Sequence, residues 1–79
     1  MKQQEYIIYI KEGCEMKTAQ MLDALGIAHR LPFTSVQIDG IQHLALSQNG
    51  IIYACFEPES RERILSLPYV IEIALAKND

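Results

Sequence analysis

The sequence lacks any long apolar stretch. No run approaches the roughly 18 residues that a membrane-spanning helix requires, so no membrane partner is expected. At the N-terminus, about five apolar residues precede Lys11 and Glu12, which is too few for the core of a signal peptide. The chain as given is therefore expected in the cytoplasm, or outside the cell if it is cut from a longer secreted precursor.

Basic residues are also scarce. Seven lysines and arginines stand against ten aspartates and glutamates, which gives a formal net charge of −3. A protein that neutralises nucleic-acid phosphates needs a surplus of lysine and arginine. This balance argues against a general polyanion binder, and nucleic acid is not the expected partner.

Metal-ligating and redox cysteine motifs are missing as well. The two cysteines, Cys14 and Cys55, have a spacing that fits neither a zinc site nor a redox pair. We expect both to be reduced thiols, with Cys55 a small buried residue. The two histidines, His29 and His43, add no ligand spacing to them, so no metal and no cofactor is expected.

No catalytic motif stands out either. Nucleophilic catalysis needs a nucleophile, a base and an orienting group within mutual reach. Either histidine could approach a cysteine in the folded chain, but no spacing indicates it. A chain of 79 residues also forms a poor water-excluding pocket. We therefore expect a protein that is not an enzyme.

The composition is that of one small folded domain covering residues 1–79. Hydrophobic residues make up 49% and charged residues 22%, the balance of a globular protein. A domain of this size buries a smaller share of its surface than a large one, so its stability is expected to be modest. The sequence contains no internal repeat, low-complexity tract or linker.

The first quarter of the chain predicts a strand followed by a helix. Residues 5–12, EYIIYIKE, are apolar on both sides in their middle, which is typical of a central strand. Gly26 stands where a left-handed helix C-cap is expected, which predicts a helix over residues 15–25. Its apolar stripe recurs every three residues and consists of Met16, Ala19, Leu22 and Leu25.

Residues 27–56 carry strands and turns. Asp39-Gly40 and Asn49-Gly50 are both strong hairpin signals. They divide the stretch into HRLPFTSVQI, IQHLALSQ and IIYACFE, which predicts two or three strands. Pro32 has no N–H to donate, so the first piece is an edge strand or enters a strand after the proline.

The last third predicts a second helix and a final strand. Pro58 suits the first helical position. Pro68 ends the helix, because the residue before a proline is pushed out of the helical region. A strand then runs from Tyr69 to Leu75, and one of its faces carries Ile71, Ile73 and Leu75.

The predicted order is β-α-β-β-α-β, with room for one extra hairpin strand. Right-handed crossovers place both helices on the same face of an antiparallel sheet, which predicts a ferredoxin-like α+β sandwich. The other face of the sheet would be uncovered and would expose apolar side chains. Such a face is a partner surface, and a homodimer is one way to cover it.

RNA-recognition and ACT-like domains share this element order and are the alternative. IYIKEG, residues 8–13, resembles the shorter RNA-recognition motif, with Tyr9 at the base-stacking position. NGIIYACF, residues 49–56, resembles the longer motif, with Gly50, Tyr53 and Phe56 in matching places. LDALGIAH, residues 22–29, resembles the helix-to-strand step of ligand-sensing ACT domains.

The segment RERILSLPYVIEI, residues 61–73, has the most specific pattern. A helix that ends in L-P-x-V and is followed at once by a strand resembles the inhibitor I9 family. This family comprises the propeptides of subtilisin-like serine proteases and related free-standing protease inhibitors. Other segments resemble its first strand, first helix, central hairpin and second helix, namely YIIYIKEG, MKTAQMLDALG, SVQIDGIQHLAL and PESRERILSLPYV.

The resemblance implies a non-catalytic, protease-binding module that acts in cis or in trans. A propeptide of this kind is an intramolecular chaperone and then a temporary inhibitor of its subtilisin-like protease. Its open sheet face lies on two surface helices of the protease, and its C-terminal tail enters the cleft as an added strand. The tail in this sequence would be Leu75, Ala76, Lys77, Asn78 and Asp79.

Overall fold

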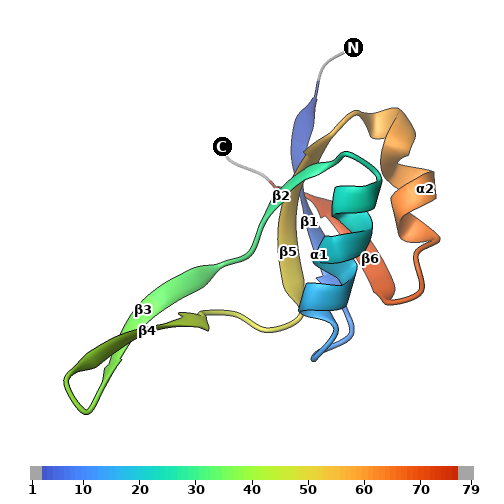
Figure 1. Cartoon of the computed structure of the whole chain (residues 1–79). Coiled ribbons are helices and arrows are strands. Elements are labelled where there is room, and N and C mark those ends of the chain that lie inside the picture. The colour runs from blue at the N-terminus through green and yellow to red at the C-terminus, as the bar shows by residue number, and fades with distance from the viewer. Residues whose placement is uncertain (1–2, 77–79) are drawn as a thin grey trace.

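The computed structural model describes residues 3–76 and consists of a body with one projecting hairpin (Figure 1). The elements in chain order are β1 (Gln4–Ile10), α1 (Glu15–Ala24), β2 (Ala28–Arg30), β3 (Phe33–Ile38), β4 (Ile41–Leu46), β5 (Ile51–Phe56), the 3-10 turn η1 (Pro58–Ser60), α2 (Arg61–Leu65) and β6 (Val70–Leu75). The prediction of an α+β protein with two helices is confirmed. No helix among the described residues is long and apolar enough to cross a membrane.

The body contains a four-stranded sheet with the order β2-β5-β1-β6. Central strand β1 pairs antiparallel with β5 on one side and with β6 on the other, and β2 pairs antiparallel with β5. The predicted antiparallel pairing is therefore confirmed. Strands that follow each other through a helix are separated in the sheet by one inserted strand.

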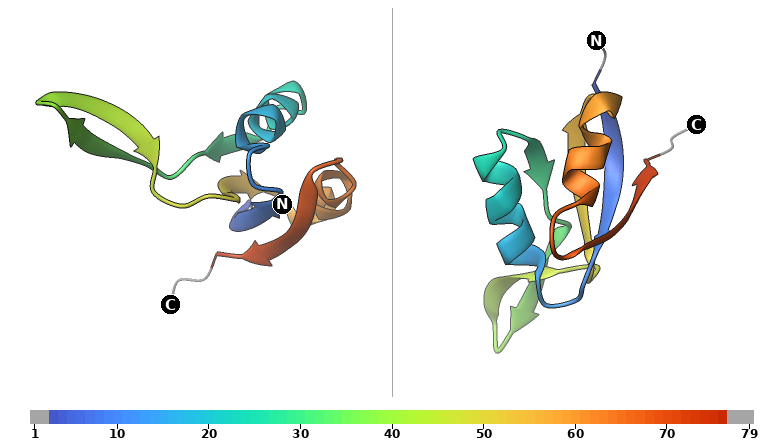
Figure 2. Two further views of the ribbon diagram at one scale, coloured as in Figure 1. Left: turned by 90° about the horizontal axis from the view of Figure 1, so that it is seen from below. Right: turned by 90° about the vertical axis from the view of Figure 1, so that its right-hand side faces the viewer.

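The core lies between the sheet and both helices. Alternate side chains of the sheet are buried on one face, and the helices supply Ala19, Leu22 and Ile64 to the same cluster. Because both helices contribute to one core, both cover the same face of the sheet (Figure 2). The sheet side of this core consists of Tyr6, Ile8, Ile10, Ile52, Ala54, Phe56 and Ile73.

Helix α1 follows the prediction closely but buries a different stripe. Met16 is 60% exposed, and the fully buried Thr18 takes its expected place, with its hydroxyl donating to the Cys14 carbonyl at 2.8 Å. Gly26 adopts the left-handed conformation with φ of 73° just beyond the helix, as predicted for a C-cap. The buried face contains residues 15, 18, 19 and 22, which is ordinary helical spacing.

One of the two hairpin signals is confirmed and the other is wrong. Asp39 and Gly40, with φ of 54° and 77°, form the two-residue turn between β3 and β4. Asn49-Gly50 joins β4 to β5, which lie in different sheets and do not pair. Residues 27–56 therefore hold four strands, and not the two or three that were expected.

The β3–β4 hairpin begins and ends at a closed neck. Pro32 lies between β2 and β3, which confirms that the chain enters a strand after the proline. Ser47 donates both its backbone N–H and its hydroxyl to the Pro32 carbonyl, at 2.7 and 2.8 Å. Beyond this neck the hairpin projects from the body, as Figures 1 and 2 show.

The corner around Pro68 is less abrupt than predicted. Helix α2 ends at Leu65, and β6 begins at Val70, so a turn separates them. The Val70 N–H donates to the Leu67 carbonyl at 3.2 Å, which places Pro68 at the second position of a β-turn that favours proline. The proline therefore shapes the turn, and the helix ends before it.

Strand β6 also differs from the predicted pattern. Ile73 is buried, but Ile71 is 67% exposed and Leu75 is exposed too. A register shift against β1 between Tyr9 and Ile10 takes Ile71 out of the alternation along β6. Ile73 and Leu75 share a face, as predicted, because they pair with Ile8 and Tyr6, but Ile71 does not join them.

Candidate partner-binding face of the sheet

The face of the sheet opposite the helices is the candidate site. Paired residues of neighbouring strands share a face, and successive residues of a strand alternate between faces. Ile7 pairs with Tyr53 and with Ala74, and none of the three belongs to the core. We define the open face as this row and the adjacent row, that is Ile7, Tyr53, Ala74, Tyr9, Ile51 and Glu72.

The open face is apolar and aromatic with one carboxylate. Tyr9 is 39% exposed, Glu72 is exposed, and the aliphatic side chains of Ile7 and Ile51 are half-buried. No helix among residues 3–76 covers this face, since both helices pack on the other. The expectation of an uncovered face with apolar side chains is therefore confirmed for the described chain.

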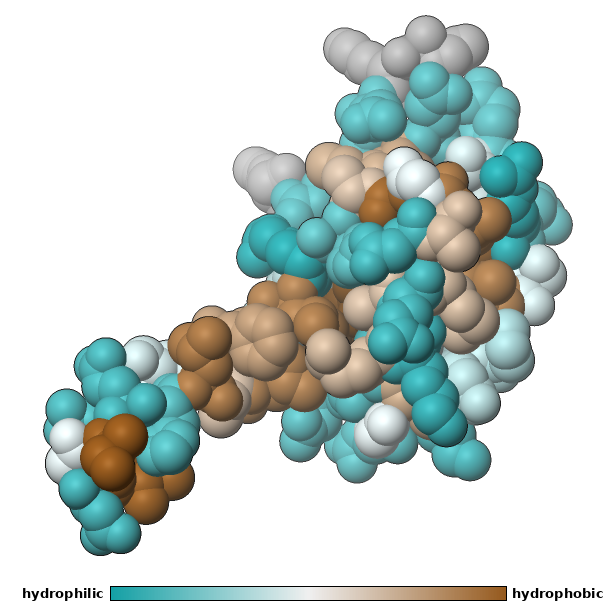
Figure 3. All heavy atoms as spheres, in the orientation of Figure 1, coloured by the Kyte–Doolittle hydropathy of each residue, from teal (hydrophilic) through white to brown (hydrophobic). Residues whose placement is uncertain are grey.

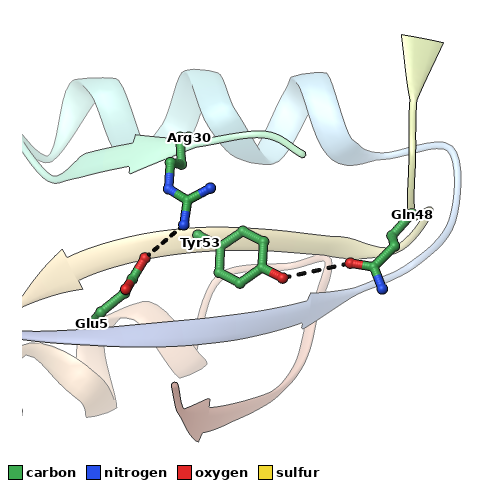
Figure 4. A network of polar contacts seen from close by, with 4 residues as sticks. All are labelled: Glu5, Arg30, Gln48 and Tyr53. Carbon is green, nitrogen blue, oxygen red and sulfur yellow. Dashed lines mark hydrogen bonds and ion pairs between the residues drawn. The ribbon is translucent and has the colours of Figure 1, made fainter. Parts of the chain in front are cut away.

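A polar network borders the open face on the β2 side (Figure 4). Arg30 donates to a Glu5 carboxylate oxygen at 3.1 Å, and its guanidinium lies 4.4 Å from the centre of the Tyr53 ring. The Tyr53 hydroxyl donates to the side-chain oxygen of Gln48 at 3.5 Å. Glu5 and Arg30 are both substantially solvated, so their ion pair contributes at most about 1 kcal/mol.

A pocket of about 170 Å³ lies beside this network, and its lining includes Glu5, Arg30 and Cys55. It is smaller than the roughly 300 Å³ at which drug-sized ligand pockets begin. Cys55 is half-buried on the open side of β5, so the prediction that it is buried is wrong. Both cysteines are free thiols.

The structure does not bring the histidines to the cysteines on one face. His29 pairs with the buried Ala54, whereas Cys55 pairs with Ala28, so His29 and Cys55 belong to opposite faces. The His29 ring contacts the Ile27 carbonyl at 2.9 Å through Nδ1. His43 lies in exposed β4. Over residues 3–76, no group of three or more potential ligands is placed to hold a metal ion.

Glu15 is a buried charge that the sequence reading did not single out. The residue is only 5% exposed, and its carboxylate accepts the backbone N–H of Gly50 at 2.7 Å and of Gly13 at 3.0 Å. The hydrogen bond from Gly50 is the main reason why the pKa of Glu15 lies below its ordinary value of 4.5, and it outweighs the opposing effect of burial. The sequence does offer one signal for this role, namely a glutamate at the first position of a helix, two residues after the glycine of the preceding loop.

Glu15 fixes the end of the sheet where Tyr9 lies. Gly50 donates to Glu15, and its carbonyl accepts the Ile10 N–H at 2.9 Å. Ile51, the next residue, pairs with Tyr9 on the open face. The buried carboxylate therefore positions the loop before β5 and, through it, one end of the candidate site.

The predicted tail lies partly within the described chain. Leu75 pairs with Tyr6, and the Ala76 N–H donates to the Glu5 carbonyl at 2.9 Å, so the ladder with β1 extends through Ala76. Strand β6 is an edge strand of the sheet. Lys77, Asn78 and Asp79 lie outside the described residues.

The positions taken from the RNA-recognition pattern divide between the two faces. Tyr9 and Tyr53 lie on the open face, on the two neighbouring central strands. Phe56 lies in the core, where its ring stacks on Tyr6 with centroids 4.2 Å apart. No family model matches the sequence, and no curated protein matches it.

Proposed function

We propose that this protein is a non-catalytic module that binds a subtilisin-like serine protease, as a propeptide-like inhibitor or an intramolecular chaperone. The open face carries the proposal. It presents Tyr9 and Glu72 side by side on strands β1 and β6, and β6 leads directly into the C-terminal tail. A surface for docking and a strand for entering a cleft therefore lie next to each other.

We interpret the body as a ferredoxin-like sandwich with a hairpin inserted after its second strand. The unit β1-α1-β2 encloses β5, and the unit β5-α2-β6 encloses β1, so the two β-α-β units are interleaved. This interleaving, with both helices on one face, is the support for the assignment. It leaves the opposite face available for a partner.

The open face suits the surface helices of a protease. Tyr9 and Ile7 offer apolar area next to each other on β1, and tyrosine is enriched among the residues that contribute most of the binding energy of an interface. Glu72 is an exposed carboxylate in the same row as Tyr9. A carboxylate placed at a helix N-terminus contributes about 0.3–1 kcal/mol, so Glu72 would add a two- to fivefold gain in affinity.

Strand β6 supplies the second contact. As an edge strand, it directs alternate backbone N–H and C=O groups away from β1, where another strand can pair with them. A tail that continues from Leu75 would then lie in the cleft as an added strand, with main-chain hydrogen bonds giving affinity. Removal of residues 76–79 should weaken inhibition and leave docking of the open face intact.

The experiment is a titration of subtilisin-like proteases with the domain, read as residual activity on a peptide substrate. The open-face variant is Tyr9→Asp, and Met16→Asp on the outer surface of α1 is its matched control. We expect the wild type and Met16→Asp to inhibit at micromolar domain or below, and Tyr9→Asp to inhibit at least tenfold more weakly. An absence of inhibition across the panel would refute the inhibitory function.

RNA binding is the second candidate, because Tyr9 and Tyr53 lie on the open face of adjacent central strands. Exposed aromatic side chains on such strands stack on the bases of single-stranded RNA. A mobility-shift assay at low salt distinguishes the two functions. An RNA-binding domain would shift RNA and lose affinity in both Tyr9→Ala and Tyr53→Ala, whereas a protease-binding domain would shift none.

A further inference from the structure

The β3–β4 hairpin exposes apolar side chains that the body does not use. Ile41 is 62% exposed, and none of the buried core residues belongs to the hairpin. Figure 3 shows hydrophobic side chains along the projecting arm. The large exposed apolar residues of the arm are Phe33, Val36, Ile38, Ile41 and Leu44. A single two-stranded hairpin is at best marginally stable in water, so these residues need a surface to pack on.

The molecule is also more extended than a compact chain of its length. Its accessible surface is 5281 Å², whereas a compact monomer of 9.0 kDa has about 4,900 Å². Its radius of gyration is 13.6 Å, against about 11.6 Å for a compact chain of 79 residues. Both excesses fit an arm that extends from the body and leaves exposed the surface that a compact chain of this size would bury.

The arm also lacks the features that keep edge strands apart. Its six residue pairs run from Phe33–Leu46 to Ile38–Ile41 without a register shift, and neither strand contains a charged residue or a proline. Soluble proteins normally protect a free edge with lysine, proline or a bulge. Neither β3 nor β4 pairs with a third strand among the described residues.

The lack of charge on the arm restricts the partners that it can take. Between Leu31 and Gln48 the only formally charged residue is Asp39 in the turn, and there is no lysine or arginine. A nucleic acid or an anionic membrane would need basic residues, and an oppositely charged protein would need a charged patch. An equally neutral apolar strand fits, and a second copy of this acidic chain can bring its arm up without like-charge repulsion.

We propose that the β3–β4 hairpin is a dimerisation arm, which packs against the hairpin of a second copy across a two-fold axis. Such an interface is self-complementary, because the same residues lie on both sides. The arm projects beyond the neck at Pro32 and Ser47, so the open face of each body remains accessible. The protein would then present two open faces, and the proposal does not depend on what binds there.

The test is the molar mass in solution, measured by light scattering and by sedimentation from about 5 to about 500 µM. Ile41→Lys removes apolar area from the arm and places two like charges at the interface. Ile71→Lys is its control, since Ile71 is the same residue type, is similarly exposed and lies in the body. We expect the wild type and Ile71→Lys to dimerise with micromolar dissociation constants, and Ile41→Lys to be at least tenfold weaker.

A second variant removes the arm altogether. Because the Ser47 N–H lies 2.7 Å from the Pro32 carbonyl, two glycines can replace residues 33–46 without moving the body. We expect this variant to keep the circular dichroism of a folded α+β domain and to be monomeric throughout. A monomeric wild type at the highest concentration would overturn the proposal, and so would a dimer that survives removal of the arm.

Discussion

At the residue scale, the hydrogen bond from the Gly50 N–H to the Glu15 carboxylate positions the loop before β5. The carboxylate of Glu15 accepts two backbone N–H groups, which gives the buried charge the partners that it requires. Gly50 has φ of 80°, which only glycine adopts without strain. The sequence marked Gly50 as a turn residue, but a turn signal carries no information about which carboxylate the turn will meet 35 residues earlier along the chain.

Glu15→Gln should destabilise the protein at neutral pH by about 1.5–3 kcal/mol, because hydrogen bonds to a charged group have this worth and the amide retains one accepting oxygen. The pKa of Glu15 is lowered by folding, so its contribution is present above pH 4.5 and is lost as the pH falls through the lower folded value. Urea unfolding at a series of pH values measures this.

The wild type should lose stability below pH 4.5 more steeply than Glu15→Gln, and the two should converge in acid. Glu12→Gln, which changes an exposed carboxylate in the same loop, serves as the control and should behave like the wild type. A constant difference between Glu15→Gln and the wild type at every pH would contradict the charge-based account.

Gly50→Ala should cost more than Gly26→Ala, although both glycines have positive φ. At Gly26 an added Cβ meets nothing within 4 Å, so the cost is the left-handed conformation alone, about 1–2 kcal/mol. At Gly50 the Cβ would also lie 3.2 Å from the Ile10 carbonyl oxygen, closer than an ordinary van der Waals contact, so the backbone there must shift. Thermal unfolding of both variants measures the difference, and equal melting temperatures would show that the approach to the Ile10 carbonyl has no cost.

At the element scale, local sequence signals predict elements whose partners lie close in sequence. The start and C-cap of α1, the Asp39-Gly40 turn and the break at Pro32 follow from short-range chemistry. The separation of β4 from β5 does not, because Asn49-Gly50 satisfies the local rule for a hairpin while the pairing is decided by β1. In the same way, α2 ends at Leu65 and not at Pro68, and the proline lies in the β-turn that follows the helix.

Helix α2 spans five residues, and Ile64 is its only buried side chain. Leu65 packs against the same core while half-buried, and Arg61 donates to the Ile73 carbonyl at 3.1 Å, so Ile64 supplies the deepest of the contacts that attach the helix. Ile64→Ala should lower the free energy of unfolding by about 2–5 kcal/mol, a large share of the total for a domain of this size. Chemical denaturation measures this, with half-buried Leu65→Ala as the control. A smaller loss in Ile64→Ala than in Leu65→Ala would show that α2 is held by other contacts.

At the scale of the whole molecule, the open face was predicted and the arm was not. The uncovered face follows from the element order, since β-α-β units are expected to cross over right-handed, and the structure has both helices on one side. The arm depends on which strands pair with which, and a short sequence pattern does not record that choice. FTSVQI and IQHLAL, residues 33–38 and 41–46, pair with each other beyond the neck at Pro32 and Ser47, and they add to neither edge of the four-stranded sheet.

The open face and the β3–β4 arm are separate surfaces, so the function of each can be tested without changing the other. Loss of the arm should convert the protein to a monomer and leave binding through the open face unchanged. Substitution on the open face should leave the dimer unchanged. The position of Tyr9 in the body and of Ile41 in the arm makes the two variants independent.

The central claim is that the open face binds a subtilisin-like protease. The most direct measurement is the residual activity of such a protease titrated with wild-type domain and with Tyr9→Asp. We predict inhibition by the wild type at micromolar domain or below, and at least a tenfold loss of potency in Tyr9→Asp, with Met16→Asp unchanged. Full protease activity at every concentration of the wild-type domain, or equal inhibition by all three proteins, would contradict it.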